Sequence, residues 1–285
     1  MLFASTDLAT RIEAAECELL SASARAVDGA AHGVEVVVVP FAGGLAIWAG
    51  QGSPLNKVAG LGFAGPVDEA ALQEVETIYE ARGTPVQVEL SALAEPSIGR
   101  TLTRRGYDLV GFENVLGTRL VATDPGHRFG EGGDVVVAPA AAEDFEAWLD
   151  VVVRGFSTPD EHGVPAHESF GEEGLKEVVR HMSRAQGMVR YLARREGALA
   201  GGASMRLGRH VAHLCGASTL PAHRRRGVQR ALLGRRLADA QAAKCEVAVV
   251  TTLPGSTSQK NVQALGFQLL YTRAILVRAP ATLDD

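Results

Sequence analysis

Residues 219–233 read TLPAHRRRGVQRALL, and this stretch decides how the second half of the chain is interpreted. It places a strand end, a proline turn, the arginines 224–226, Gly227 and the start of an amphipathic helix in direct succession. The first backbone N–H groups of a helix have no internal acceptor, and the helix dipole adds about half a positive charge there. Glycine lets the backbone close on an oxygen, and arginines pair with phosphate oxygens. The stretch therefore predicts a loop that binds a phosphate ester.

The same basic stretch has two other interpretations. An arginine-glycine cluster also occurs as a hydrated helix start with no ligand. The preceding strand, Pro221 and the Leu-Gly-Phe segment at 265–267 favour the phosphate site. Nucleic-acid binding is disfavoured, because no aromatic residue interleaves with Arg224–Arg226 or Arg230 and base-stacking platforms need such residues. We expect no nucleic-acid partner.

Strands and helices alternate around this loop. The apolar spacing predicts strands at 134–139, 188–194, 198–207, 210–219, 245–252 and 267–278, and helices at 141–156, 172–184, 228–243 and 256–265. The turn pairs Glu196-Gly197 and Gly208-Arg209 join the middle strands into an antiparallel meander. The predicted class is α/β, with a mixed sheet flanked by helices.

These residues resemble the GNAT acetyltransferase superfamily, whose pyrophosphate loop has the form Gln/Arg-x-x-Gly-x-Gly/Ala between a strand and a helix. Arg224 and Gly227 match this form, whereas Gln229 stands where Gly or Ala is usual. The segment 254–267 (PGSTSQKNVQALGF) is similar to the family segment in which a Ser or Asn contacts CoA and a helix ends in Leu-Gly-Phe. The resemblance covers residues 133–279 and implies the acyl-CoA N-acyltransferase fold.

The resemblance also implies the cofactor, acetyl-CoA (CoA), with its pyrophosphate on the loop. In this family the strands expected at 210–219 and 245–252 splay apart around the thioester, and a backbone N–H near Thr219 faces the thioester carbonyl. The three cysteines show no metal-ligand spacing, so no metal is expected. The implied cofactor-binding residues are Thr219, Leu220, Arg224, Arg225, Arg226, Gly227, Val228, Gln229, Arg230, Ser258 and Asn261.

The acid and base that family members often use are not at their usual positions. Strand 210–219 has no acidic residue, and Val262 stands in place of the usual tyrosine. His210 and His213 lie on opposite faces of that strand, so only one faces the cleft, and His213 is the candidate base. A strand histidine also occurs as a packed core residue.

Two further residues are candidates for the chemistry. Tyr271 on the closing strand is a candidate proton donor, with simple packing as its alternative. Glu168 lies in the segment 157–169, which joins two predicted helices and covers the acceptor side in this family. It is a candidate base or amine ligand, although solvated loops are also routinely acidic.

The first half of the chain contains a weaker copy of the same pattern. LTRRGYDLVGFENV echoes VQALGFQLLYTRAI, and aligning Gly106 with Gly266 gives an offset of 160 residues. The loop RRRGVQ then falls opposite residues 64–69 (AGPVDE), which open their helix with two acids. We expect two GNAT-like domains in tandem, a degenerate copy without a phosphate loop at 1–122, a linker at 123–132 and the transferase domain at 133–285.

The leading hypothesis is an N-acetyltransferase that moves an acetyl or short acyl group from acyl-CoA to a primary amine of a small molecule or peptide by direct attack. One alternative is a CoA-binding regulatory module without catalysis, because the usual acid and tyrosine are missing. Another is an aminoacyl-tRNA-dependent transferase, since those also pair two such folds. The first domain is expected to scaffold the second, shape the acceptor cleft or mediate homodimerisation.

Composition limits the compartment and the partners. The net charge of −5 argues against a generic nucleic-acid binder. The N-terminal region is acidic where a signal peptide needs an apolar run, and no run of 18 apolar residues occurs, so no membrane partner is expected. Three widely separated cysteines fit a reducing compartment, and a cytoplasmic location is expected.

Overall fold

The computed structural model describes residues 2–29, 35–120, 133–158, 172–208 and 210–280. The chain forms two compact units. The C-terminal unit comprises Met1–Leu2 and Leu116–Leu269, and the N-terminal unit comprises Phe3–Val115 and Leu270–Asp285. The expected linker at 123–132 lies outside the described residues, so a domain division there stays a prediction.

Two strands begin in one unit and end in the other. Strand β5 (Asp108–Arg119) starts in the N-terminal unit and ends in the C-terminal unit, while β11 (Gln268–Arg278) does the opposite. Leu116 of β5 belongs to the core of the C-terminal unit, and Leu276 of β11 belongs to the core of the N-terminal unit. Most of the closing strand, expected in the second domain, is therefore packed in the other unit.

In the C-terminal unit, five neighbouring strands follow the order β10-β9-β8-β7-β6. Neighbours are antiparallel except β9 and β10, which are parallel, so the predicted antiparallel meander and mixed sheet are confirmed. The strands are β6 (Val135–Pro139), β7 (Met188–Arg195), β8 (Ala198–Leu207), β9 (Val211–Thr219) and β10 (Val247–Thr252).

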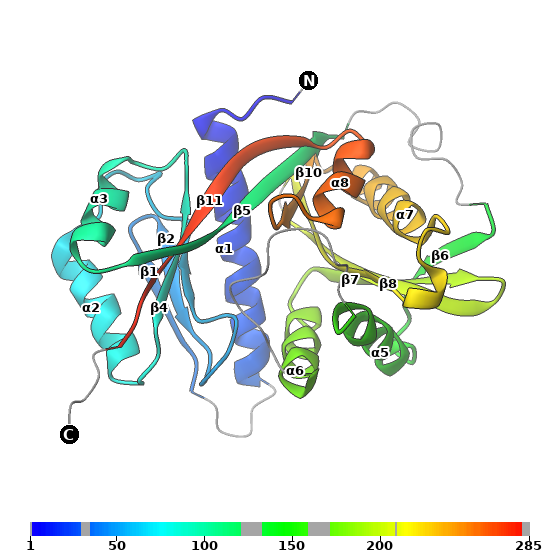
Figure 1. Ribbon diagram of the computed structural model, residues 1–285, viewed down its shortest axis with the longest axis horizontal. Helices are drawn as coiled ribbons and strands as arrows, with labels where there is room; N and C mark the ends of the chain where they lie inside the picture. Colours follow the sequence, from blue (N-terminus) through cyan, green and yellow to red (C-terminus); the bar gives the residue numbers. More distant parts are fainter. Residues whose placement is uncertain (1, 30–34, 121–132, 159–171, 209, 281–285) are drawn as a thin grey trace. The chain divides into compact units, whose positions relative to one another are not determined.

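Helices cover both faces of this sheet (Figure 1). Neighbouring strand residues point to opposite faces, and Tyr191 packs with residues of α7 while Leu192 packs with residues of α5. The helices are α5 (Phe145–Phe156), α6 (Glu172–Ser183), α7 (Val228–Ala242) and α8 (Thr257–Ala264). Helix α5 begins four residues later than expected because Ala141 and Asp144 close a turn first, with Asp144 N–H bonded to the Ala141 carbonyl (3.2 Å).

The N-terminal unit has the strand order β1-β2-β3-β4-β11, with β3 and β4 parallel. Its core joins Leu72, Val75 and Tyr79 of α2 to Val58 and Val88 of the central strands. The elements are α1 (Thr6–Gly29), β1 (Val37–Phe41), β2 (Gly44–Trp48), β3 (Lys57–Ala59), α2 (Glu69–Glu80), β4 (Val86–Ser91) and α3 (Ser97–Arg104). The long helix α1 was not expected from the sequence.

The two units repeat one arrangement of elements. Helices α3 and α8 begin 160 residues apart (97 and 257), and β5 and β11 keep the same spacing (108 and 268). Gly106 and Gly266 end these helices in the left-handed region, at φ +81° and +88°. Only glycine adopts that conformation without strain, so the echo around these glycines reports a real repeat of structure.

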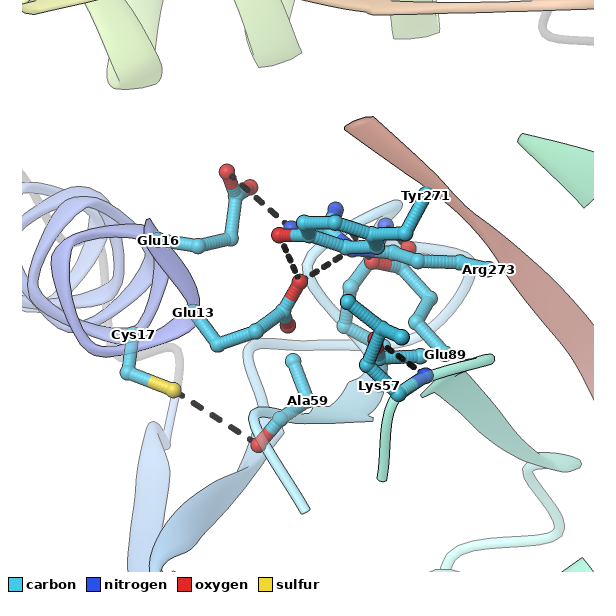
Figure 2. A network of polar contacts seen from close by, with 10 residues as sticks. Glu13, Glu16, Cys17, Lys57, Ala59, Glu89, Tyr271 and Arg273 are labelled. Carbon is cyan, nitrogen blue, oxygen red and sulfur yellow. Dashed lines mark hydrogen bonds and ion pairs between the residues drawn. The ribbon is translucent and has the colours of Figure 1, made fainter. Parts of the chain in front are cut away.

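A buried network of charged residues occupies the interior of the N-terminal unit (Figure 2). Arg273 Nε lies 2.9 Å from Glu13 Oε1, and Arg273 Nη1 lies 3.5 Å from Glu89 Oε2. Lys57 Nζ pairs with the same Glu89 at 2.5 Å. Two cations thus hold carboxylates that come from α1 and β4.

None of the described helices combines the length and the apolar character that a membrane crossing requires.

Candidate cofactor site

Helix α7 begins without a capping side chain. Gly227 precedes it in the left-handed region (φ +79°), and the Gly227 carbonyl accepts the N–H of Ala231 at 2.9 Å. The N–H groups of Val228 and Gln229, in the first turn, therefore have no acceptor inside the helix. Together with the helix dipole, they form a site that favours an anion.

The loop before α7 is held in a bent conformation. A short 3₁₀ turn, Pro221–His223, is closed by the N–H of His223 bonded to the Leu220 carbonyl at 2.8 Å. Arg225 then adopts φ +60°, which costs a non-glycine residue about 1 kcal/mol or more. Strained residues of this kind are common at ligand sites, where the surrounding structure maintains them.

The guanidinium of Arg224 ties this loop to two other segments. Its Nε donates to the Thr219 carbonyl at 3.4 Å, and its Nη2 donates to the Thr158 carbonyl just beyond α5. Arg224 was expected from the sequence to contact phosphate. In the structure it also holds the end of β9, the loop and the end of α5 together.

A cleft of about 1260 Å³ opens over this loop. This volume exceeds the roughly 300–1,000 Å³ of a typical small-molecule pocket and suits an extended cofactor. Among the described residues that line it, none is an aspartate or a glutamate, and the basic ones are His223, Arg224, Arg225, Arg230 and Lys260. The cleft is therefore positive although the whole chain carries a net charge of −5.

Most predicted cofactor-binding residues line this cleft. All of them do so except Leu220 and Arg226. Leu220 instead donates its backbone N–H to the Ala200 carbonyl of β8 at 3.0 Å, and Arg226 is exposed. The structure thus brings the loop, the end of β9 and the candidates Ser258 and Asn261 of α8 to one place.

One face of α8 adds residues that sequence reasoning missed. Thr257, Lys260 and Ala264 line the cleft beside the predicted Asn261, and the spacing of three and four residues places all four on one side of a helix. Ser256 caps α8, because its hydroxyl accepts the N–H of Gln259 at 3.2 Å. Lys260 was not predicted, and its helical spacing from Asn261 and Thr257 is the sequence signal that could have identified it.

The central strands diverge near the cleft. The parallel ladder joins β9 to β10 over Val211–His213 and Val247–Val249. Further along, the register between β8 and β9 shifts, since Ser204 faces Cys215 while Gly202 faces Ser218. This is a β-bulge in β9 at Gly216, whose φ is +52°. Residues 217–219, which follow the bulge, line the cleft.

The predicted base His213 lies inside the sheet. It faces Arg206 of β8 and Val249 of β10, and only 5% of its surface is exposed. It is not among the residues that line the cleft. His210, which was expected at the start of the same strand, lies just before β9 and is exposed, with its Nδ1 3.3 Å from Glu246. A catalytic role for His213 stays a prediction.

Tyr271 and Glu168 are the other predicted catalytic residues. Tyr271 belongs to the N-terminal unit, where its hydroxyl donates to Glu13 Oε1 at 2.7 Å. Burial and the neighbouring Glu13 raise the pKa of this hydroxyl well above its usual range. Glu168 lies outside the described residues. The structure therefore pairs Tyr271 with a carboxylate, and the roles proposed for both residues stay predictions.

The order of the elements and the mixed sheet define an acyl-CoA N-acyltransferase fold, and the cleft lies over the start of α7. The sequence comparison agrees, since residues 156–267 match the family model described as "Acetyltransferase (GNAT) family". Residues 156–267 are thus similar to the GNAT family domain. A sequence search of curated proteins finds no match.

Solved structures share the fold over most of the chain. A GCN5-related N-acetyltransferase from Kribbella flavida is 18% identical, with a TM-score of 0.61 over 94% of this chain and 96% of that chain. A tandem GNAT protein from the clavulanic acid biosynthesis pathway is 14% identical, with a TM-score of 0.60 over 87% and 83% of the two chains. A GCN5-related N-acetyltransferase from Sphaerobacter thermophilus is 14% identical, with a TM-score of 0.55 over 74% and 67%. The predicted tandem GNAT-like fold is confirmed.

Proposed function

We propose that the C-terminal unit binds acetyl-CoA and transfers its acetyl group, or another short acyl group, to a primary amine of a small molecule or peptide. The observation that carries this proposal is the uncapped start of α7 inside a large cleft whose described lining has no acidic residue. CoA is a polyanion, and its pyrophosphate is the kind of group that such a helix start binds.

The cofactor-binding role is divided among three segments of the unit. The N–H groups of Val228 and Gln229 at the helix start would bind the pyrophosphate. Arg225 and Lys260 lie on the cleft wall and would pair with outer phosphate oxygens. The pantetheine arm would then run towards the end of β9, where residues 217–219 line the cleft.

The reaction would be a direct transfer between the two substrates. The neutral amine nitrogen attacks the thioester carbonyl carbon, the C–S bond breaks, and the amine loses a proton to a base while the CoA thiolate gains one. A backbone N–H near Thr219 would stabilise the negative charge that develops on the carbonyl oxygen. His213 or Glu168 as base and Tyr271 as acid remain our candidates.

Two measurements test the proposal. Calorimetric titration with CoA should give a saturable heat at one site per chain, and acetyl-CoA with a panel of amines should release free thiol, detected with a disulfide dye. A Gln229→Glu variant, which places a carboxylate at the helix start, should lose both signals. The exposed variant Arg154→Gln, on the surface of α5, is the matched control and should keep them.

A CoA-binding module without turnover is the second candidate. It is favoured by one observation, namely that neither His213 nor Tyr271 lines the cleft. Saturable CoA binding with no thiol release from any amine tested would support this candidate over the transferase. Absence of CoA binding by the wild-type chain would exclude both.

A further inference from the structure

Arg236 is a buried charged residue on the helix that carries the cofactor loop. It lies two turns into α7, and only 2% of its surface is exposed. Burial lowers the pKa of its guanidinium to about 10, and no ion pair with a described carboxylate counters that effect. A buried charge without a partner of opposite sign is costly, so its hydrogen bonds must account for its presence.

Within the described part of the chain, the guanidinium donates only to backbone carbonyls. Its Nε bonds the carbonyl of Leu232 at 3.1 Å, which bends the side chain back along α7. Its Nη1 bonds the carbonyl of Ser204 in β8 at 3.1 Å and the carbonyl of Cys215 in β9 at 3.4 Å. One side chain therefore joins the cofactor helix to two neighbouring strands.

Those two carbonyls flank the bulge in β9. A bulge interrupts the ladder of backbone hydrogen bonds, so carbonyls beside it need donors from elsewhere. Ser204 and Cys215 are the last facing pair before the register shifts. The Ser204 hydroxyl also donates to the Cys215 carbonyl at 3.3 Å. Arg236 and Ser204 thus donate hydrogen bonds at the point where the register shifts.

The bulge decides where the end of β9 points. Gly216 has φ +52°, and an added Cβ there would lie 3.1 Å from the Ser204 hydroxyl. Residues 217–219, which follow directly, line the cleft at its β9 wall. The phosphate-binding end of α7 is eight residues away from Arg236, about 12 Å along the helix. The two ends of the site can therefore be disturbed separately.

We propose that Arg236 is a positioning residue that holds the β9 bulge and so aims the backbone of residues 217–219 at the acyl group of the cofactor. This inference rests on the proposed function, because it assigns Arg236 to the thioester end of the same site. Arg236 itself is buried behind the strand and would touch neither substrate.

The test measures two quantities in the same protein, namely the hydrogen bond to the acyl carbonyl and the affinity for the phosphates of CoA. Isotope-edited infrared spectra of bound [1-¹³C]acetyl-CoA report the hydrogen bond to the thioester carbonyl, and calorimetry with CoA reports phosphate binding. Wild type should shift the carbonyl band to lower frequency. Arg236→Met should lose at least half of this shift while its CoA affinity stays within about threefold, an effect under about 0.7 kcal/mol.

Three further variants separate positioning from general stability. Arg236→Lys keeps a donor and should recover part of the shift. Gly216→Ala disturbs the bulge from its other side and should lose the shift even if Arg236→Met does not fold. Arg235→Met makes the same change on the neighbouring, half-exposed arginine of α7, and should behave as wild type.

The outcomes distinguish the inference from the proposed function. An unchanged carbonyl band in folded Arg236→Met or Gly216→Ala, with acetyl-CoA bound, overturns the positioning role alone. A parallel loss of CoA affinity and band shift also overturns it, because that result means a merely structural role. No binding of acetyl-CoA by wild type overturns the proposed function.

Discussion

The starts of α2 and α7 occupy corresponding places in the two repeats and treat their free N–H groups in opposite ways. Asp68 caps α2, since its carboxylate accepts the N–H of Ala71 at 3.0 Å, and Glu69 follows it. Gly227 opens α7 with no capping side chain. A helix that is capped by its own carboxylate has used a donor and repels a phosphate. The comparison teaches that two repeats can share a helix at the same place while only one of them leaves the start of that helix open to an anion.

The two units also differ in where they place charged side chains. In the C-terminal unit, basic residues line an open cleft. In the N-terminal unit, acidic residues of α1 and β4 gather around Lys57 and Arg273 (Figure 2), and an acidic residue of β5 interacts with the same group. These carboxylates are Glu13, Glu16, Glu89 and Glu113. One unit places basic side chains on the wall of an open cleft, whereas the other pairs its charged side chains with one another.

The largest effect is expected when the internal network loses its central cation. Arg273→Met leaves Glu13 and Glu89 buried without their guanidinium, and we expect the unit to lose about 3–5 kcal/mol of unfolding free energy. Urea unfolding followed by Trp48 fluorescence measures this in a Trp148→Phe background, because the chain has two tryptophans, one in each unit.

The control for this change is Arg154→Met, which breaks an exposed pair with Asp150 and should cost less than about 1 kcal/mol. If Arg273→Met costs no more than Arg154→Met, the network does not stabilise the N-terminal unit.

The second largest effect is expected when α7 receives the cap of α2. Gly227→Asp should weaken CoA binding about 100-fold, or about 2.7 kcal/mol, because a carboxylate takes the place of the phosphate at the helix start. Calorimetry measures the affinity. Gly227→Asn accepts the same left-handed backbone without the charge and should lose clearly less.

The reciprocal change, Asp68→Asn in α2, is the matched control in the N-terminal unit. It should leave CoA affinity unchanged, because α2 carries no phosphate site in this proposal. Equal losses for Gly227→Asp and Gly227→Asn would show that backbone strain, not charge, governs the loop.

The third effect concerns pH and the same acidic network. Burial, with nearby Glu89, raises the pKa of Glu113 from 4.5 to about 7. The folded state then binds more protons than the unfolded state between about pH 4.5 and 7, so stability falls as pH rises through that window. Wild type should lose about 1–2 kcal/mol of unfolding free energy across this window, after allowance for solvent screening, and Glu113→Gln should not show that loss.

Urea unfolding at pH 5, 6, 7 and 8, followed by Trp48 fluorescence, measures the slope. Glu113→Gln should match wild type near pH 5 and exceed its stability at pH 8. A wild-type stability that rises steadily from pH 5 to pH 7 would contradict the assignment of this proton to Glu113.

The smallest effect is expected at the edge of the cleft. Lys260→Gln should weaken CoA binding about fivefold, or about 1 kcal/mol, because one exposed charge near a phosphate is partly screened. Titrations at increasing KCl should show a smaller salt dependence than wild type. Lys176→Gln on α6, outside the cleft lining, should leave both quantities unchanged. A salt dependence equal to that of wild type would place Lys260 away from the phosphates.

Local sequence patterns determined much of this protein. The sequence alone predicted the strands and helices of the second half, the glycine at the start of α7 and the offset of 160 residues between the repeats. The elements and the glycine could be predicted because each depends on neighbours a few residues apart. The chemistry of the cofactor loop follows from the same local geometry. That is why the predicted cofactor residues gather in one cleft with few exceptions.

Only the tertiary structure decided the partners of residues that are far apart in sequence. Tyr271 bonds Glu13, 258 residues away, and β5 and β11 exchange their ends between the units. Arg236 bonds carbonyls of β8 and β9, and no local sequence pattern predicted the bulge in β9. Such contacts depend on which surfaces pack together and where a ladder breaks, and both are properties of the folded chain as a whole.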